Sequence, residues 1–357
     1  MLRVGVFMGG KSVEKEASFN SGRTICDHLD TSRYQIIPLF QRTDGTIFIL
    51  PWHFLHRGKT TDFEHRLQTE AQQVLWDDLS QHVDFMYLAI HGRYAEDGIL
   101  QGFLEVLGIP YLGSGVLTSA LCMDKIVQKK MLQAYGFQVP RGIIVTPEQI
   151  RNFAQEQTSI EHQLQGAHVT LPYIVKPEKE GSSLGVSVVL EPDQLQSALE
   201  TACYIQSYQP QAVLVEEKIE GMEFSCITLV DYKTGALLPL PPTEIVPEPG
   251  THFFGYDQKY MPGKYGKFTP ARVEASSLEL IQRTCIEVMQ KFEITTISRI
   301  DGFLTPDRRV VIIEANTLAG MGPTSFLFRQ AAEINMGHAA LINHLIETEL
   351  HAYGMGN

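Results

Sequence analysis

Two strand-like runs separated by a short turn lie near the C-terminus, and they constrain the fold more than any other stretch of this chain. The runs are 296–304 and 309–316, and the turn 305–308 reads Thr-Pro-Asp-Arg. If the runs pair antiparallel about the centre of this turn, the numbers of opposed residues sum to roughly 615. The sequence therefore predicts a β-hairpin with a fixed register.

That register would bring four polar side chains to one face of the hairpin. Asp301 lies opposite Glu314 and Arg299 lies opposite Asn316, because alternate residues of a strand share a face. The other face would carry the apolar pairs Ile300–Ala315, Gly302–Ile313 and Leu304–Val311. Carboxylates with Cβ atoms about 5 Å apart repel each other without a cation between them, and Asp, Glu and Asn oxygens suit Mg²⁺. The pattern fits a metal site and an ordinary charged hairpin face equally well.

Composition excludes several classes of protein. The 357 residues suffice for two or three domains, and 44% hydrophobic and 20% charged residues are typical of a soluble globular protein. A net charge of −12 disfavours a nucleic-acid or anionic-membrane surface, although a local basic cleft can still bind a nucleotide. The five scattered cysteines indicate buried thiols in a reducing compartment. Without a signal peptide or an apolar run of about 18 residues, we expect a cytoplasmic protein with no membrane association.

Strands and helices alternate along the first third of the chain. Strand-like runs are expected at 3–8, 36–40, 45–50 and 83–90, with helices after Ser12 and at 99–107. We interpret 45–50 as an edge strand and Ser12 as a helix N-cap, whereas 52–76 gives no assignment. This alternation predicts an open parallel sheet with functional loops at the carboxyl ends of its strands.

The pattern changes near residue 114. A helix at 116–135 is followed by strands at 142–145, 173–176, 185–189, 213–217, 223–230 and 236–246, then by the hairpin and by helices at 276–292 and 325–350. We therefore expect α/β and α+β architecture in three domains, at residues 1–113, 114–212 and 213–357.

A Gly/Ser loop at 180–185 joins two of these strands. It is not a P-loop, because the GxxxxGK[ST] pattern and a following helix are absent. Its N–H groups and the hydroxyls of Ser182 and Ser183 could contact phosphate oxygens, although a plain surface hairpin is more common. Lys176 favours the phosphate interpretation, since a lysine at the end of an apolar strand is costly without an anion. Lys125 could supply a second charge or lie on a solvated helix face.

Other candidates are weaker when taken singly. Glu217, Lys218 and Glu223 lie at a strand end and turn, where a carboxylate could accept hydrogen bonds from ribose hydroxyls. Lys259 and Tyr260 lie in a long polar stretch of the kind that often forms a lid. Each set also has a plain explanation as a solvated turn or a surface loop.

Four further residues stand at the ends of predicted elements. Glu14 begins a helix, where the helix dipole would stabilise it, and it could instead bind a substrate ammonium. His91 ends a strand and is more often a packed loop histidine than a catalytic one. Gly320 and Ser325 precede a helix, where N–H groups could stabilise an oxyanion and the hydroxyl could bind a carboxylate.

The order of these motifs along the chain resembles that of the D-alanine–D-alanine ligase family in the ATP-grasp superfamily. The matching segments are 9–18, 91–98, 123–125, 176–177, 180–185, 217–223, 259–260, 299–301 and 314–325. The resemblance implies a three-domain ATP-grasp fold with an ATP site between the central and C-terminal domains. It also implies an enzyme that joins two D-alanines through an acyl phosphate, for peptidoglycan precursor synthesis.

The resemblance further implies roles for individual residues. Asp301, Glu314 and Asn316 would hold two Mg²⁺ ions, or Mn²⁺ in their place. The residues that would contact ATP are Lys125, Lys176, Ser182, Ser183, Glu217, Lys218, Glu223 and Lys259, the last on the transferred phosphoryl group.

The substrate contacts follow from the same resemblance. Glu14 would bind the ammonium of the first D-alanine and connect through Ser182 to Tyr260, and His91 would be a further substrate-binding residue. In the second step the oxyanion would be stabilised by Arg299 and the Gly320 N–H, and the carboxylate of the second D-alanine would be bound by Ser325. The chain departs from the family at Ala95, Gly255 and Ala319, where the family usually has Gly, Asp and Pro.

Alternatives remain within and outside this family. The second substrate could be D-serine or D-lactate, although Tyr260 is associated with the dipeptide-forming branch. A nucleotide-binding regulatory protein on the same scaffold is a different class, and intact Lys176, Arg299 and Asp301 disfavour it. The resemblance also suggests a homodimer.

Overall fold

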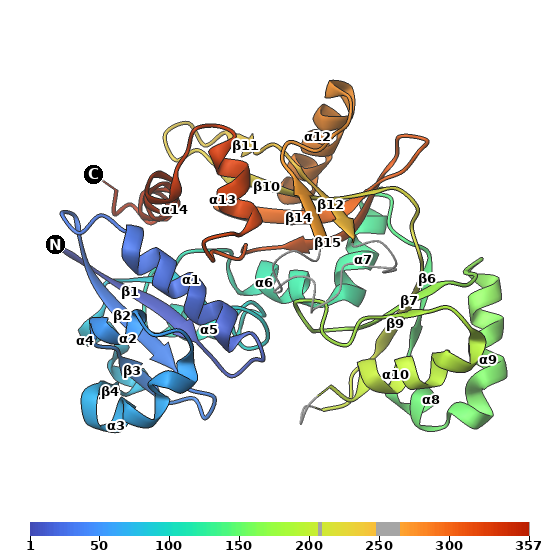
Figure 1. Cartoon of the computed structure of the whole chain (residues 1–357), viewed down its shortest axis with the longest axis horizontal. Helices are drawn as coiled ribbons and strands as arrows, with labels where there is room; N and C mark the ends of the chain where they lie inside the picture. The colour runs from blue at the N-terminus through green and yellow to red at the C-terminus, as the bar shows by residue number, and fades with distance from the viewer. Residues whose placement is uncertain (206–208, 248–264, 357) are drawn as a thin grey trace.

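The computed structural model describes residues 1–205, 209–247 and 265–356, which form three sheets with helices packed on them (Figure 1). The first sheet has the strand order β4-β3-β2-β1-β5. Its strands are β1 Leu2–Gly9, β2 Tyr34–Gln41, β3 Ile47–Ile49, β4 Gln72–Val74 and β5 Phe85–Leu88. The central β1 pairs parallel with β2 and β5, as expected, and its residues from Val4 onward are buried, which suits a strand covered on both faces.

Two antiparallel strands extend this sheet on one side. β3 pairs with β2 and β4 pairs with β3, both antiparallel. The expectation that 45–50 is an edge strand is therefore wrong, because β4, from the segment left without an assignment, covers that edge. The helices of this region are α1 Lys15–His28, α2 Trp52–Leu55, α3 Leu67–Glu70, α4 Leu79–His82 and α5 Ile99–Val106, with 3₁₀ turns at Thr60–Asp62, Glu64–Arg66 and Trp76–Asp78.

The single helix expected at 116–135 is two helices. α6 spans Val116–Met123 and α7 spans Lys125–Ala134. Asp124 has an extended backbone between them and caps α7, because its Oδ1 accepts hydrogen bonds from the backbone N–H groups of Ile126 and Val127 at 3.1 and 2.9 Å. The cap fixes Lys125 as the first residue of α7.

The second sheet is antiparallel, with the order β6-β9-β7-β8. Its elements are β6 Gly142–Val145, β7 Tyr173–Pro177, β8 Ser187–Val189 and β9 Val213–Glu217, with α8 Pro147–Arg151, α9 Phe153–Gly166, a 3₁₀ turn at Pro192–Gln194 and α10 Leu195–Cys203. The antiparallel pair expected around the Gly/Ser loop is β7–β8. Because β9 pairs in this sheet, we propose that the middle unit extends to Glu217 and not to 212.

The third sheet has the order β13-β12-β10-β14-β15, with β11 paired to β10. Its elements are β10 Met222–Val230, β11 Leu237–Pro239, β12 Thr243–Pro247, β13 Tyr265–Phe268, β14 Ile297–Leu304, β15 Val310–Asn316, α12 Ala275–Lys291, α13 Phe326–Ala332 and α14 His338–Ala352. The strand expected at 236–246 is split into β11 and β12 at Pro241-Pro242, which have no N–H to donate. The helix expected at 325–350 is likewise split into α13 and α14.

The hairpin of β14 and β15 has the predicted register at the end far from its turn. Asp301 pairs with Glu314, and Arg299 pairs with Asn316. Nearer the turn the register shifts by one, so that Gly302 pairs with Ile312. The expected partnership of Gly302 with Ile313 is therefore wrong, and the extra residue forms a bulge that turns Ile313 toward a cavity beside the sheet.

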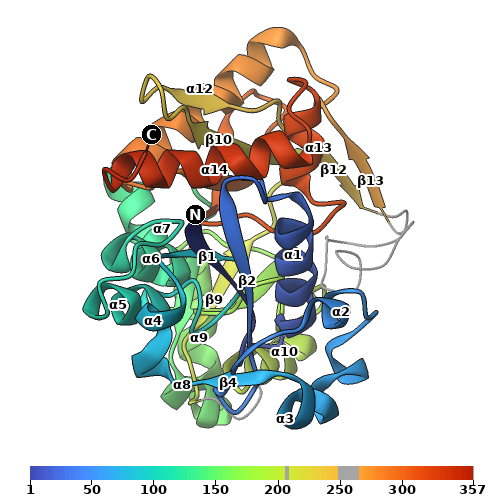
Figure 2. The same cartoon turned by 90° about the vertical axis from the view of Figure 1, so that its left-hand side faces the viewer.

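The C-terminal helix joins the first and third sheets. In Figure 2 α14 crosses the molecule next to α1. Asn343 on α14 accepts a hydrogen bond from the Asp30 N–H at 3.1 Å and donates one to the His28 carbonyl at 3.0 Å. None of the helices in the described ranges is long and apolar enough to cross a membrane.

Candidate active site

A cavity of about 680 Å³ lies between the second and third sheets. One wall comes from β7, β9 and the 180–186 loop, and the other comes from β10, β12, β14 and β15. The loop before α13 closes one end, with Gly320 and Ser325 on the lining. Most of the predicted site residues that the structure describes line this cavity.

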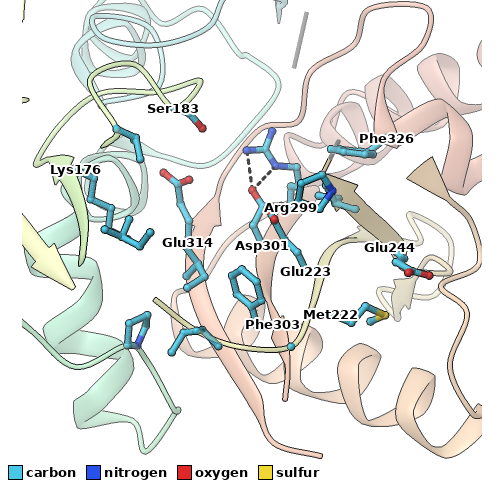
Figure 3. A pocket seen from close by; sticks show the side chains of 18 of the residues that line it. Lys176, Ser183, Met222, Glu223, Glu244, Arg299, Asp301, Phe303, Glu314 and Phe326 are labelled. Atoms are coloured by element: carbon cyan, nitrogen blue, oxygen red, sulfur yellow. Dashed lines mark hydrogen bonds and ion pairs between the residues drawn. The ribbon is translucent and has the colours of Figure 1, made fainter. Parts of the chain in front are cut away.

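The polar face of the hairpin points into the cavity. Figure 3 shows the Asp301 and Glu314 side chains directed into it from neighbouring strands. The Asp301 carboxylate accepts hydrogen bonds from Ser225 Oγ at 2.7 Å and from Arg299 Nε at 3.1 Å. Glu314 lies 3.1 Å from the Lys125 ammonium. Each of the two opposed carboxylates is thus balanced by a cation of the chain, as the expected repulsion between them requires.

Arg299 is held as a half-buried cation on this face. Burial opposes its charge, but Asp301 and Glu314 outweigh that effect and raise the pKa of the guanidinium above its usual value. A permanently charged group with five N–H donors can therefore face reacting oxygens from the floor of the cavity.

The oxygen atoms on this face fit a hard divalent cation. Asn316 Nδ2 lies 3.4 Å from the Asp301 carboxylate, so the amide oxygen reaches the same place if the amide turns over. Among the described residues no three Asp, Glu, His or Cys side chains gather as a metal cluster. Asn316 would be the third protein ligand of such a cation, and substrate phosphate oxygens would complete the shell, as is usual for Mg²⁺.

Lys125 connects the metal face to the Gly/Ser loop. Its ammonium donates a hydrogen bond to the Glu180 carbonyl at 2.6 Å while it pairs with Glu314. Ser183 in that loop lines the cavity, and both Ser182 and Ser183 have positive φ angles of 50° and 58°. Non-glycine residues rarely adopt this conformation, and its clustering here is typical of a functional loop.

Lys176 belongs to a buried group that sequence reasoning missed. Its ammonium lies 2.5 Å from one carboxylate oxygen of Glu216, and Lys129 pairs with the other oxygen. Burial raises the pKa of Glu216, but Lys176 and Lys129 outweigh burial and hold it below its usual value. Burial likewise lowers the pKa of Lys129, and Glu216 opposes that shift only in part. The signal lay in the β7–β9 register, which sets Glu216 opposite Ile174 and thus on the same face as Lys176.

The predicted adenine and ribose contacts come from β9, from β10 and from the turn between them. Glu217, Lys218 and Glu223 all line the cavity. The Glu217 carboxylate accepts hydrogen bonds from the backbone N–H and the Nε of Arg141 at 2.8 and 2.9 Å. Glu217 is therefore partly engaged, whereas Lys218 lies next to it at the end of the strand.

Glu14 occupies a narrow slot between two loops beside the cavity. It stands at the N-cap of α1 without capping it, and its carboxylate accepts a hydrogen bond from Ser182 Oγ. A Cβ at Gly92 would lie 2.4 Å from this carboxylate, and one at Gly181 would lie 2.6 Å from it. Only glycine fits at either position while Glu14 keeps this place, so both loops are shaped around it.

His91 lies behind the cavity wall and not on its lining. It is 6% exposed, and its Nε2 is 2.8 Å from Ser21 Oγ. That hydroxyl also accepts a hydrogen bond from the Met321 N–H at 3.2 Å, so His91 supports the loop that carries Gly320. This matches the packed-histidine interpretation more closely than direct substrate contact.

The loop before α13 offers open polar groups to the cavity. Ser325 Oγ is buried and makes no hydrogen bond within the described part of the chain. No atom of the described residues outside its chain neighbours lies within 4 Å of where a Cβ of Gly320 would be, which leaves its backbone accessible from that side. Lys259 and Tyr260 fall outside the described residues.

The three sheets, with a cavity between the second and third, define the class of protein as an ATP-grasp fold. Residues 3–114 match the family model described as D-ala D-ala ligase N-terminus, and residues 131–347 match the one described as D-ala D-ala ligase C-terminus. The chain belongs to the D-alanine–D-alanine ligase family.

Similar proteins span the whole chain. It is 32% identical to D-alanine–D-alanine ligase A of Escherichia coli K12, covering 100% of this chain and 98% of that protein. It is 31% identical to D-alanine–D-alanine ligase of Chlorobium chlorochromatii, covering 97% of each.

Solved structures show the same likeness. The VanG D-Ala:D-Ser ligase from Enterococcus faecalis superposes with a TM-score of 0.82 at 26% identity, covering 98% of this chain and 99% of that one. A D-alanine–D-alanine ligase from Bacillus anthracis complexed with ATP gives 0.71 at 26% identity, with 99% of each chain covered.

Proposed function

We propose that this protein joins two D-alanines into D-alanyl-D-alanine while converting ATP to ADP and phosphate, as a step in peptidoglycan precursor synthesis. The observation that carries the proposal is the face on which Asp301 opposes Glu314, with Lys125 and Arg299 beside them, in a cavity of a chain that belongs to this family. Relatives of similar length bear the name of this activity.

ATP would lie in the cavity with its phosphates toward the hairpin. Its contacts would be Lys125, Lys176, Ser182, Ser183, Glu217, Lys218 and Glu223, with Lys259 over the transferred phosphoryl group. Lysines balance the phosphate charge, while hydroxyl and N–H groups of the Gly/Ser loop donate hydrogen bonds to phosphate oxygens. The similar Bacillus anthracis structure complexed with ATP supports binding of ATP by this chain.

Asp301, Glu314 and Asn316 would hold two Mg²⁺ ions, or Mn²⁺. Bound there, the ions would neutralise negative charge on the phosphate oxygens. Arg299 stays outside the ligand set, because its guanidinium repels a cation and pairs with Asp301.

The first step phosphorylates the first D-alanine. Glu14 holds its ammonium, and the Ser182 hydroxyl that donates to Glu14 keeps that carboxylate in place. A carboxylate oxygen of D-alanine attacks the γ-phosphorus, the bond between that phosphorus and the ADP oxygen breaks, and an acyl phosphate and ADP result. His91 acts as a positioning residue behind this site, and Tyr260 would continue the Glu14–Ser182 connection.

The second step forms the peptide bond. The neutral amine of the second D-alanine attacks the acyl carbon, the carbonyl oxygen becomes an oxyanion, and phosphate leaves with the electron pair of the broken C–O bond. Arg299 and the Gly320 N–H stabilise that oxyanion, while Ser325 binds the carboxylate of the incoming amino acid. The nitrogen loses a proton as the amide forms.

D-Serine is a second candidate for the accepting substrate. The likeness to the VanG D-Ala:D-Ser ligase favours testing it, although that likeness concerns the fold as a whole. Both substrates carry the carboxylate that Ser325 would bind, so they differ only at the side chain.

A phosphate-release assay with the purified protein tests the proposal. ATP and Mg²⁺ are supplied with D-alanine alone, with D-alanine plus D-serine, with D-alanine plus D-lactate, or with L-alanine, and the products are separated by mass spectrometry. We expect D-alanyl-D-alanine as the main product and no reaction with L-alanine. A protein that binds ATP but releases no phosphate with any of these would instead support the nucleotide-binding regulatory alternative.

We further propose a homodimer in the cytoplasm as the working state. The support is the resemblance to the family and the scattered reduced thiols, since all five cysteines are buried and free. Light scattering behind a sizing column distinguishes a particle of twice the 40.1 kDa chain mass from a monomer.

A further inference from the structure

A lysine on the outermost strand of the third sheet faces the same cavity as the metal face. Lys267 on β13 pairs with Ile245 on β12, Ile245 pairs with Glu223 on β10, and Glu223 pairs with Phe303 on β14. Directly opposed residues share a face of a sheet, so these four side chains form one row across four strands. All four line the cavity. Asp301 is two residues from Phe303 and shares the face, which places Lys267 on the side of the sheet that carries the predicted chemistry.

The Lys267 ammonium lies next to the loop that would bind the second substrate. Its Nζ is 4.5 Å from the centre of the Phe326 ring, and Phe326 directly follows Ser325. Ser325 Oγ is buried, lines the cavity and makes no hydrogen bond within the described residues. A buried hydroxyl without such a bond leaves a donor and an acceptor available to a ligand.

Two positive charges lie close together at this end of the cavity. Burial and the positive charge of Arg329 on α13 together lower the pKa of Lys267 to about 8. Glu244 on β12 lines the same region, but it is engaged by Arg272 at 2.8 Å. Two cations kept close together favour binding of an anion.

Two of the proposed phosphate-binding lysines belong to the other wall. Lys176 comes from the second sheet and Lys125 from the start of α7, whereas Lys267 comes from the far edge of the third sheet. Figure 3 shows Lys176 and Phe326 on opposite sides of Arg299 and Asp301. The anion at Lys267 is therefore separate from the phosphates and lies on the side of Ser325.

We propose that Lys267 is a specificity-determining residue that binds the carboxylate of the accepting amino acid, together with the Ser325 hydroxyl. The Lys267 ammonium contacts the face of the Phe326 ring, and the substrate carboxylate binds this ammonium from the cavity. This role rests on the proposed function. It requires an accepting substrate with a free carboxylate and disfavours one in which that group is an amide.

A competition between two acceptors tests the role of Lys267. D-Alanine is both donor and acceptor, and D-alaninamide can act only as an acceptor because it has no carboxylate to phosphorylate. With both present, the ratio of dipeptide to dipeptide amide reports recognition of the acceptor carboxylate alone. We expect Lys267→Met to lower this ratio about 10- to 100-fold, the worth of a hydrogen bond between charged groups. Lys267→Arg should retain most of the ratio, and neither variant should change the KM for ATP.

Lys233→Met is the matched control, because Lys233 also lies over an aromatic ring, that of Tyr232, but on an exposed turn away from the cavity. It should leave the product ratio unchanged. A ratio in Lys267→Met equal to that of the unaltered protein overturns the role, and a raised KM for ATP would assign Lys267 to phosphate binding instead. If Lys267→Met does not fold, as judged by thermal melting, Lys267→Gln takes its place. Failure of the unaltered protein to release phosphate with D-alanine overturns the proposed function itself, which is a different result from an unchanged ratio.

Discussion

Replacing Glu216 by glutamine should destabilise the protein much more than the same change at the next residue. The Glu216 side chain is 3% exposed, and its two lysine partners, Lys176 and Lys129, are 8% and 15% exposed. Glutamine has nearly the same volume but no charge, so the substitution leaves two buried ammonium groups without their anion. The comparison with Glu217 isolates the effect of burial on stability, because both residues are glutamates on the same strand, β9, and each pairs with a cation.

The magnitude follows from how buried each ion pair is. Removing one partner of a buried pair costs about 3–5 kcal/mol. Burial already lowers the pKa of Lys129, so it can lose its proton and relieve part of this cost, and we expect about 3 kcal/mol for Glu216→Gln. The Glu217 carboxylate pairs with Arg141, whose side chain is 57% exposed, and an exposed pair contributes about 0–1 kcal/mol.

Urea unfolding followed by fluorescence and by circular dichroism measures both variants against the unaltered protein. The double variant Lys129→Met/Glu216→Gln should recover part of the loss, because it removes one of the two uncompensated cations. Equal destabilisation by Glu216→Gln and Glu217→Gln would refute the reasoning. The reasoning would also be refuted if the double variant lost more unfolding free energy than the two single variants lose when their losses are added.

Three further predictions concern other parts of the molecule. Glu349 accepts hydrogen bonds from the Gly113 N–H and the Thr296 hydroxyl, and burial raises its pKa to about 7, above its usual value. The contribution of protonated Glu349 to stability is therefore fully present below about pH 4.3 and is lost as pH rises through 7. Compared with the unaltered protein, Glu349→Gln should raise the free energy of unfolding at pH 8 by up to about 3 kcal/mol and leave it unchanged at pH 4. A melting profile across pH that is the same for both proteins would contradict this. Asp301→Asn should lower turnover by at least about 100-fold and weaken the dependence of ATP binding on Mg²⁺ in titration calorimetry, whereas unchanged values would remove Asp301 from the metal site. Finally, burial raises the pKa of the Cys122 thiol to about 12, and all five cysteines are buried, so a thiol reagent should label none in the native protein and five in denaturant.

The hairpin register could be predicted because it depends on local information. The turn fixes the centre of symmetry, and side-chain alternation then decides which residues share a face. Asp301 opposite Glu314 followed from these two facts, and the structure confirms it. The bulge at Ile313 could not be foreseen, since its place depends on how β15 meets the cavity and not on the turn.

Pairings between distant strands were beyond the sequence. Glu216 reads as an acidic residue in an apolar strand, and only the register of β7 with β9 brings Lys176 to it. Lys129 joins them from α7, whose start is fixed by the Asp124 cap. This cap was not predicted, because the helical periodicity of 116–135 continues across it. β4 escaped notice because three residues with a polar start carry no strand pattern of their own.

Lys267 was missed for a similar reason. It lies on a short edge strand, and nothing in its neighbours predicts that it faces a cavity. Its position follows from four strands in register, of which β10 and β14 lie far apart in the chain. Glu14 was predicted from its place at the start of a helix, but the importance of Gly92 and Gly181 was not. Both glycines could be recognised only once the structure placed them against the same carboxylate.

The most direct test of the account counts products against ATP. Purified protein with ATP, Mg²⁺ and D-alanine should release one phosphate and form one D-alanyl-D-alanine for each ATP consumed. Neither product should form without D-alanine. Phosphate release without dipeptide, or binding of ATP with no turnover at all, would contradict the claim that this cavity joins two amino acids.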